Sequence, residues 1–239
     1  MKSLWVLLAS LSFAFAPFMT PDFGGFDPDR YPIPQLNSPV QPVGWAFAIW
    51  GIIYLVLILH AVVGFARHKH DQNWEPARLP LFISLAIGTG WLLVASVSPV
   101  WATLLIIVML ASALMALYRM RSASPAWIAS WPVALYTGWL SAASFVSLGL
   151  LLAGYGVLSE TMAAIVALTL ATLFALYHQL KLALWPYAAA VAWGFFGIAV
   201  SNLGKQDLIA LLAAAAALAL LAVAAVQWRR NPIHPRQEN

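Results

Sequence analysis

Residues 79–118 contain no charged side chain, and this long uncharged stretch limits the possible folds more than any other feature. One crossing of a bilayer needs about 20 apolar residues, so the stretch is long enough for two crossings. Ser98 and Pro99 lie near its middle, and proline disfavours helix at the residue before it. We therefore predict two membrane helices, 79–98 and 100–119, joined by a turn at Ser98-Pro99.

The whole chain shares this apolar character. Its 239 residues are 63% hydrophobic and 8% charged, whereas soluble domains carry about 25% charged residues. A chain with so little charge is expected to face lipid, so we predict an all-α integral membrane protein, a multispan helical bundle of about eight helices. The expected spans are 3–17, 45–65, 79–98, 100–119, 130–153, 160–179, 184–203 and 207–228.

The basic residues predict one orientation, because loops on the cytoplasmic side carry an excess of Lys and Arg. Alternating spans place ten of the twelve basic residues on one side, with Arg30 and Lys205 on the other. The ten are Lys2, Arg67, Lys69, Arg78, Arg119, Arg121, Lys181, Arg229, Arg230 and Arg236. Both termini are then cytoplasmic, and a bacterial cell (inner) membrane is the favoured localisation.

The first segment has two interpretations. Lys2, the apolar run after it and Ala14-Phe15-Ala16 fit a cleaved signal peptide as well as a retained helix. Pro17 is unfavourable directly after a cleavage site, so we expect residues 1–16 to stay as a membrane helix, with a cleaved signal as the alternative.

Residues 17–44 hold seven of the fifteen prolines and cannot form a regular helix. A loop of this length is either a solvated linker or a functional element, such as a lid over a pocket at the outer face. Its aromatic residues favour the lid, because a solvated linker has less reason to carry them. They are Phe18, Phe23, Phe26 and Tyr31.

The expected spans carry almost no residues suited to catalysis. No Asp, Glu, Lys or Arg lies at mid-span, and the sequence has no cysteine. Ion-coupled transporters need charged groups inside the membrane, and hydrolysis needs paired carboxylates or a nucleophile with its base. We therefore expect neither an enzyme nor a metal site. The basic residues form no patch on a soluble face, so no nucleic-acid partner is expected.

Aromatic residues are the remaining signal, with twelve tryptophans in the chain. Tryptophans near helix ends fit an interfacial belt, but Trp50, Trp91, Trp139 and Trp193 are expected to lie deeper. Phe47, Trp50 and Tyr54 are spaced i, i+3 and i+7, and Tyr136 and Trp139 are spaced i and i+3, so each set shares one helix face. Such rings could line a pocket for a flat apolar ligand; ordinary helix packing is the alternative.

Residues 38–54 read SPVQPVGWAFAIWGIIY and resemble the second-helix entry of the tryptophan-rich sensory proteins, also called the translocator-protein or TspO/MBR family. That entry has the pattern P-P-G-W-V-F-x-x-V-W-x-x-L-Y. The pattern falls here on Pro42, Gly44, Trp45, Phe47, Trp50 and Tyr54.

The resemblance continues along the chain. Trp91 matches the tryptophan of the family's N-x-x-W-S-x-x-F segment, and 132–143 fits the P-x-x-L-Y-x-G-W-x-x-x-A of longer members. Three family residues differ. Gly88 replaces an asparagine before the tryptophan, Val43 replaces a proline, and the asparagine of the fifth helix is either replaced by Ser144 or lost.

The resemblance implies a five-helix core at 1–153, with its long outer loop at 17–44, followed at 154–239 by three further helices and a short basic cytoplasmic tail. It also implies a membrane sensor or binding protein, often a homodimer, that takes a porphyrin, haem or another small hydrophobic ligand beneath the loop, with possible links to transport or signalling. The ligand residues expected are Trp45, Phe47, Trp50, Tyr54, Trp91, Tyr136 and Trp139. A small-molecule permease of another class and a membrane assembly protein without a ligand are the alternatives.

Overall fold

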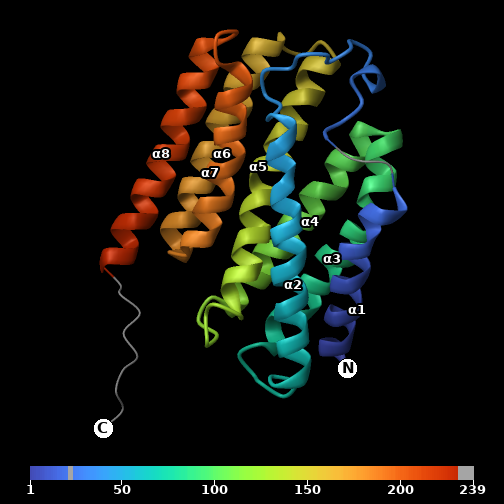
Figure 1. The fold of residues 1–239 in the computed structure, drawn as a ribbon, viewed down its shortest axis with the longest axis vertical. Helices are drawn as coiled ribbons and strands as arrows, with labels where there is room; N and C mark the ends of the chain where they lie inside the picture. Colours follow the sequence, from blue (N-terminus) through green and yellow to red (C-terminus); the bar gives the residue numbers. More distant parts are fainter. Residues whose placement is uncertain (21–23, 231–239) are drawn as a thin grey trace.

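The computed structural model describes residues 1–20 and 24–230, and the regular secondary structure of this part is entirely helical (Figure 1). It confirms the predicted all-α multispan bundle. The eight α-helices of the described residues are α1 Lys2–Phe15, α2 Ile49–Ala66, α3 Glu75–Val97, α4 Pro99–Met120, α5 Ser130–Gly154, α6 Glu160–Leu182, α7 Trp185–Asn202 and α8 Asp207–Arg230. Phe23, Arg236 and the tail 231–239 lie outside the described residues.

Seven of these helices are long and apolar enough to cross a membrane, and α7 is the exception. The span expected at 184–203 is therefore a helix in the expected place, but not one of the seven. The reason lies in its surroundings, since α7 packs against both α5 and α8. A helix covered by protein does not need the hydrophobicity of a helix that faces lipid.

The turn predicted at Ser98-Pro99 is present. α3 ends at Val97, and Pro99 is the first residue of α4. The Ser98 hydroxyl accepts a hydrogen bond from the backbone N–H of Trp101 at 3.4 Å. Proline is well tolerated at the first position of a helix, because the N–H that it lacks has no partner there in any case.

The helices form two groups that share α5. α1 packs against α2 and α3, α3 packs against α4, and α4 and α2 both pack against α5, which closes a five-helix ring. On the other side of α5 lie α6 and α7, and α8 covers both of them (Figure 1). As a result, 17 of the 25 residues of α5 are buried. The division of the chain into two units at residue 153 stays a prediction.

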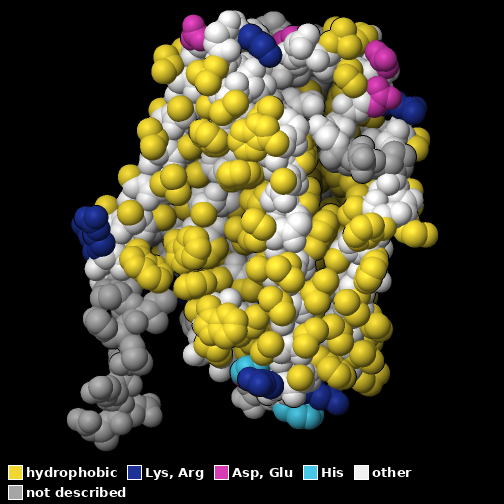
Figure 2. Space-filling model, viewed as in Figure 1, with side chains coloured by type: hydrophobic (Ala, Val, Ile, Leu, Met, Phe, Trp, Pro, Cys, Tyr) yellow, Lys and Arg dark blue, Asp and Glu magenta, His cyan; other side chains and the backbone are white. Residues whose placement is uncertain are grey.

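Charged side chains gather at the two ends of the bundle, with a hydrophobic surface between them (Figure 2). The acidic residues visible in this view lie at the end that carries the 24–44 loop, while histidines and most of the visible basic residues lie towards the opposite end (Figure 2). Asp71 and Glu75 also lie at this opposite end, where they pair with His68 and Arg78. α1 begins and α8 ends towards this second, basic end (Figure 1). An integral membrane protein has this distribution of charge; which end faces the cytoplasm stays a prediction.

The short connection between α2 and α3 is tightly held at the basic end. The Trp74 ring lies between the rings of His60 and His68, with centroids 4.8 Å and 4.5 Å away and nearly parallel planes. The buried Arg78 guanidinium donates to the carbonyl oxygen of Lys69 at 2.8 Å and to that of His68. These contacts satisfy backbone groups that a loop would otherwise expose.

Candidate ligand-binding site

Two adjoining hollows lie beneath the 24–44 loop, walled mainly by the five-helix ring and, at Gly194, by α7. We call them the loop-side hollow and the α1-side hollow, and Phe47, Trp91 and Ile106 line both. The loop-side hollow is also lined by Gly25, Phe26, Gln41, Pro42, Trp139, Ala142, Ala143, Val146, Ser147, Leu150 and Gly194. The α1-side hollow is also lined by Phe13, Pro17, Thr20, Trp50, Tyr54, Gly88, Leu92, Met109 and Leu140.

The hollows are large in outline but narrow inside. Space not filled by atoms, including the open mouths, amounts to about 460 Å³ in the loop-side hollow and about 680 Å³ in the α1-side hollow. The centre of a water molecule can move through only about 40 Å³ and about 160 Å³ of them, respectively. Even together, these volumes are smaller than usual ligand pockets of about 300–1,000 Å³, so a large ligand would need the two hollows both to join and to widen.

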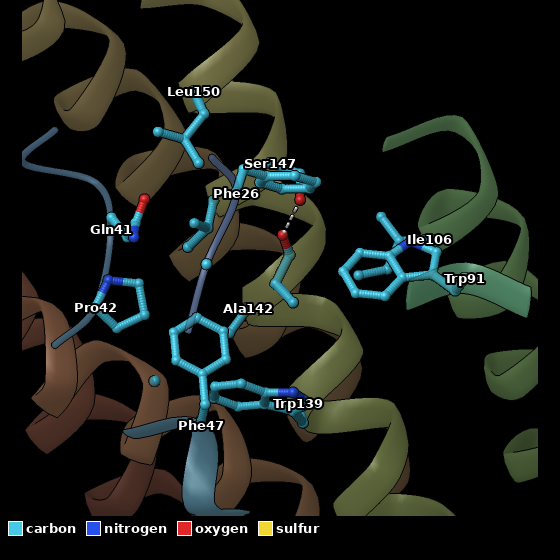
Figure 3. A pocket seen from close by; sticks show the side chains of 14 residues that line it. Phe26, Gln41, Pro42, Phe47, Trp91, Ile106, Trp139, Ala142, Ser147 and Leu150 are labelled. Carbon is cyan, nitrogen blue, oxygen red and sulfur yellow. Dashed lines mark hydrogen bonds between the residues drawn. The ribbon is translucent and has the colours of Figure 1, made fainter. Parts of the chain in front are cut away.

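Phe47 and Trp139 form the inner wall of the loop-side hollow (Figure 3). Their ring centroids are 5.9 Å apart and their planes are nearly perpendicular, at 86°. Phe47 belongs to η3, a short 3₁₀-helix at Gly44–Ala48 that leads into α2, and Trp139 lies on α5. Trp139 is buried, and its indole N–H has no hydrogen-bond partner among the described residues. A buried donor without an acceptor costs free energy unless water or a ligand supplies one.

Trp50 and Tyr54 line the α1-side hollow together with Phe13 of α1. The Trp50 and Tyr54 rings stack at 5.5 Å with an angle of 16° between their planes. The Phe13 ring meets both of them edge-on, at 5.7 Å and 5.1 Å. Edge-to-face and offset-stacked pairs are the favoured arrangements of aromatic rings.

Trp91 of α3 lies between the two hollows and faces Ile106 of α4 (Figure 3). Its indole N–H donates to the carbonyl oxygen of Ala102 at 2.8 Å, which links α3 to α4. Its ring also meets Phe26 of the loop, with centroids 6.0 Å apart. Trp91 is therefore anchored through its N–H, and its ring lines both hollows.

Two of the expected ligand residues line neither hollow. Trp45 is 44% exposed and packs against Trp193 and Phe196 of α7, with centroids 5.2 Å and 5.9 Å away. Tyr136 is fully buried on α5, and its hydroxyl lies 2.8 Å from the Ser84 hydroxyl of α3. The other five expected residues all line a hollow: Phe47, Trp50, Tyr54, Trp91 and Trp139.

The loop lies over the hollows and turns two of its aromatic residues inward. Phe26 and Tyr31 are buried, whereas Phe18 is 81% exposed. The Tyr31 ring packs against Gly154 at the end of α5, where any larger side chain would collide with it. Burial raises the pKa of the Tyr31 hydroxyl. This geometry supports the prediction of a lid over a pocket.

α7 holds the end of this loop through three hydrogen bonds. The Asn202 side chain donates to the carbonyl oxygen of Pro39 at 2.8 Å, and the Trp193 indole N–H donates to that of Ala46 at 2.8 Å. The backbone N–H of Val43 donates to the carbonyl oxygen of Gly197 at 3.2 Å. A helix beyond the five-helix ring thus positions the segment that covers the hollows.

A polar depression opens at the loop end of the bundle, beside the loop-side hollow. Gln41 and Pro42 line both, so they separate the apolar interior from the polar surface. The remaining lining is Pro28, Gln35, Leu36, Asn37, Ser38, Ser201, Asn202, Lys205 and Gln206. Buried oxygens of Gln35 and Ser38 have no hydrogen-bond partner among the described residues.

Sequence reasoning missed Phe13, Gly88 and Gln41 as parts of the site. Phe13 stands in a uniformly apolar run, so its role depends on how α1 packs and has no local signal. Gly88 did carry a signal, because it departs from the asparagine of the resembled pattern. Gln41 is one of few polar residues in its stretch, but only the fold shows that it separates the two spaces.

The fold and the site define a polytopic helical membrane protein with an aromatic chamber under the 24–44 loop. A family model described as "TSPO-like protein" matches residues 32–226, which is most of the chain. The chain therefore belongs to the TSPO-like family, as the resemblance in the sequence predicted. No curated protein and no solved structure gives a significant match.

Proposed function

We propose that this protein binds a planar apolar ligand, such as a porphyrin, in the chamber formed by the two hollows, and acts as a sensor or binding protein rather than an enzyme. The observation that carries the proposal is the convergence of five rings on one space from α1, η3, α2, α3 and α5. They are Phe13, Phe47, Trp50, Trp91 and Trp139. Membership of the TSPO-like family adds support.

The chemistry of the lining suits such a ligand. Ring faces stack on a flat π-system, and the unpaired indole N–H of Trp139 offers a donor to a polar edge. Lys205 in the neighbouring polar depression carries a positive charge that would favour a carboxylate on the same ligand. Among residues 1–20 and 24–230, no histidine lines either hollow, so a metal-free porphyrin is the suitable probe.

The ligand would have to join the two hollows. Phe47 and Trp91 stand on the boundary between them. Trp91 is tied to Ala102 through its indole N–H, and the Phe47 ring meets the Trp139 ring edge-on. We propose that the Phe47 ring exchanges ring contacts of this kind for contacts with the ligand when the ligand enters.

A permease would need a polar path through the bundle. Polar side chains line the depression at the outer face, but the two hollows have mostly apolar walls. This distribution supports binding over passage of a polar solute. If the protein were an assembly protein without a ligand, the buried N–H of Trp139 would have no ligand to supply its missing hydrogen-bond acceptor. The implied homodimer, the inner membrane and the cytoplasmic termini stay predictions.

The test is a titration of the detergent-purified chain with protoporphyrin IX, followed by the absorbance of the porphyrin. We expect saturable binding that Trp50→Ala weakens about tenfold, because stacking on one ring contributes about 1–3 kcal/mol. Trp139→Phe keeps a ring but loses the N–H, and we expect a loss of about two- to tenfold.

Trp45→Phe is the matched control, because Trp45 belongs to the same sequence motif but lines neither hollow. It should bind as the parent does. Non-saturating signals that are equal in all four proteins would mean that the porphyrin only partitions into the micelle, and the proposal would then be wrong.

A further inference from the structure

A groove at the basic end of the bundle lies on the opposite side of α5 from the chamber. We call it the tryptophan groove. It is bounded by Trp131 at the start of α5, Trp185 at the start of α7, and Trp228 and Arg229 at the end of α8. Space not filled by atoms, including its open mouth, is about 870 Å³.

Three indoles meet at this groove. The Trp131 ring lies 5.3 Å from the Trp185 ring, at 76°, and 6.2 Å from the Trp228 ring, at 57°. Trp185 and Trp228 are 41% and 45% exposed. An interfacial belt places single tryptophans around the perimeter of a membrane protein. Here, three of them come from three different helices to surround one groove.

The floor of the groove is made of small residues. Ala189 of α7 and Ala224 and Ala225 of α8 leave a slot between the two helices, and Leu221 lies beside it. All four side chains are apolar and offer no hydrogen bond. The slot suits an extended hydrocarbon chain.

The mouth of the groove carries donors without acceptors. Within residues 1–20 and 24–230, Arg229 has no carboxylate at ion-pair distance, and the indole N–H groups of Trp131, Trp185 and Trp228 make no hydrogen bond to the protein. Figure 2 shows basic side chains at the lower end of α8, next to a hydrophobic surface. A guanidinium beside free N–H donors suits a phosphate group.

We propose that the tryptophan groove binds one anionic phospholipid, with an acyl chain along the alanine floor and the headgroup phosphate at Arg229. Apolar lining dominates the groove, which favours a lipid over free phosphate. Basic pockets between membrane helices are known to bind anionic headgroups, and indoles lie at headgroup level in a bilayer. The site is independent of the proposed ligand chamber.

The test is native mass spectrometry of the full-length protein in detergent, titrated separately with phosphatidylglycerol and with phosphatidylcholine of the same chains, and with inorganic phosphate added alone and as a competitor. We expect phosphatidylglycerol to bind more tightly. Arg229→Gln should weaken it about fivefold, the effect of one basic residue near an anionic lipid. Arg230→Gln is the matched control, because Arg230 does not line the groove, and it should change the affinity less than twofold.

A second pair of variants tests the floor. Ala225→Leu should fill the slot and weaken both phospholipids, whereas Ala222→Leu adds the same bulk to an exposed position of α8 outside the groove and should not. Both pairs of substitutions lie at exposed positions, so the fold should survive, and circular dichroism checks this.

Three results would overturn the proposal. They are equal affinity for the two lipids, equal losses in Arg229→Gln and Arg230→Gln, and displacement of the lipid by inorganic phosphate alone.

Discussion

The Phe13 ring of α1 occupies the space that a side chain at Gly88 of α3 would need. A Cβ atom built on Gly88 would lie 2.7 Å from Cε2 of Phe13, closer than two carbon atoms approach without repulsion. The resembled family pattern has an asparagine at this position. In this protein an aromatic ring from another helix therefore replaces a polar amide in the wall of the α1-side hollow.

Substitution of Gly88 tests this fit. Gly88→Ala should lower the free energy of unfolding by about 1–3 kcal/mol, the usual cost of an overpacked core. Thermal unfolding in detergent, followed by circular dichroism, measures the change. Gly90→Ala is the matched control, because nothing lies within 4 Å of a Cβ at that position and alanine favours helix over glycine. Similar losses in both variants would contradict the close fit of Phe13 against Gly88.

We expect the hydrogen bond from Asn202 to Pro39 to keep the 24–44 loop closed over the hollows. Asn202→Leu removes the donor and leaves the Pro39 carbonyl oxygen unpaired, which costs about 1–3 kcal/mol. The loop should then open more often, so trypsin should cut after the exposed Arg30 faster than in the parent. Ser201→Ala, next to Asn202 but without a hydrogen bond to the loop, should be cut at the parental rate. An unchanged rate in Asn202→Leu would mean that other contacts hold the loop.

We expect the hydrogen bonds of Arg78 to stabilise the α2–α3 connection. The guanidinium is 6% exposed and donates to two backbone carbonyl oxygens, those of His68 and Lys69. Arg78→Gln should destabilise the protein by about 1–3 kcal/mol, because these acceptors lose their donor. Arg67→Gln changes an exposed charge in the same connection and should cost less than about 0.5 kcal/mol. Chemical denaturation in mixed micelles gives the free energy of unfolding of both variants. Equal losses would show that the positive charge, and not the hydrogen bonds of Arg78, stabilises the connection.

We expect the contribution of Asp71 to the stability of the same connection to depend on pH. Its carboxylate accepts from the backbone N–H of Asn73 at 2.8 Å and lies 3.0 Å from Nδ1 of His68, and these hydrogen bonds lower its pKa. A lowered pKa in the folded state stabilises the protein above the ordinary carboxyl pKa of about 3.9, and this contribution is lost as the pH falls through the lowered value.

The melting temperature of Asp71→Asn tests this sign. The variant should melt below the parent near neutral pH, and the difference should shrink as the pH falls below about 4. A difference in melting temperature that stays constant down to about pH 3 would mean that folding does not lower the pKa of Asp71.

The helices were predictable because their signals are local. The Ser98-Pro99 turn and the apolar runs on either side of it mark α3 and α4 without any tertiary information. The shared face of Trp50 and Tyr54 on α2 was predictable for the same reason, since helical spacing alone brings side chains together. The stacked pair of Trp50 and Tyr54 has this origin.

The parts that were not predictable depend on contacts between distant segments. Trp193 was expected only as a deep aromatic residue, yet its indole N–H reaches Ala46, 147 positions earlier in the chain. Trp45 carries a family motif but turns towards α7, because its place in η3 differs from that of a straight helix. Predicting a shared face from i, i+3 and i+7 spacing assumes a regular α-helix that packs against a single neighbour. Just before α2 the chain is instead a 3₁₀-helix, and Trp45 packs against α7.

The position of α5 between two groups of helices has a consequence for how the protein is made. Gly138 of α5 lies directly against the backbone of Tyr187 in α7, and the Ser141 and Tyr187 hydroxyls are 3.0 Å apart. A ribosome delivers α5 before α6, α7 and α8 exist. Until they arrive, this side of α5 must rest against lipid or an insertion factor, so the newborn chain passes through a half-enclosed stage that ends only when α7 is in place.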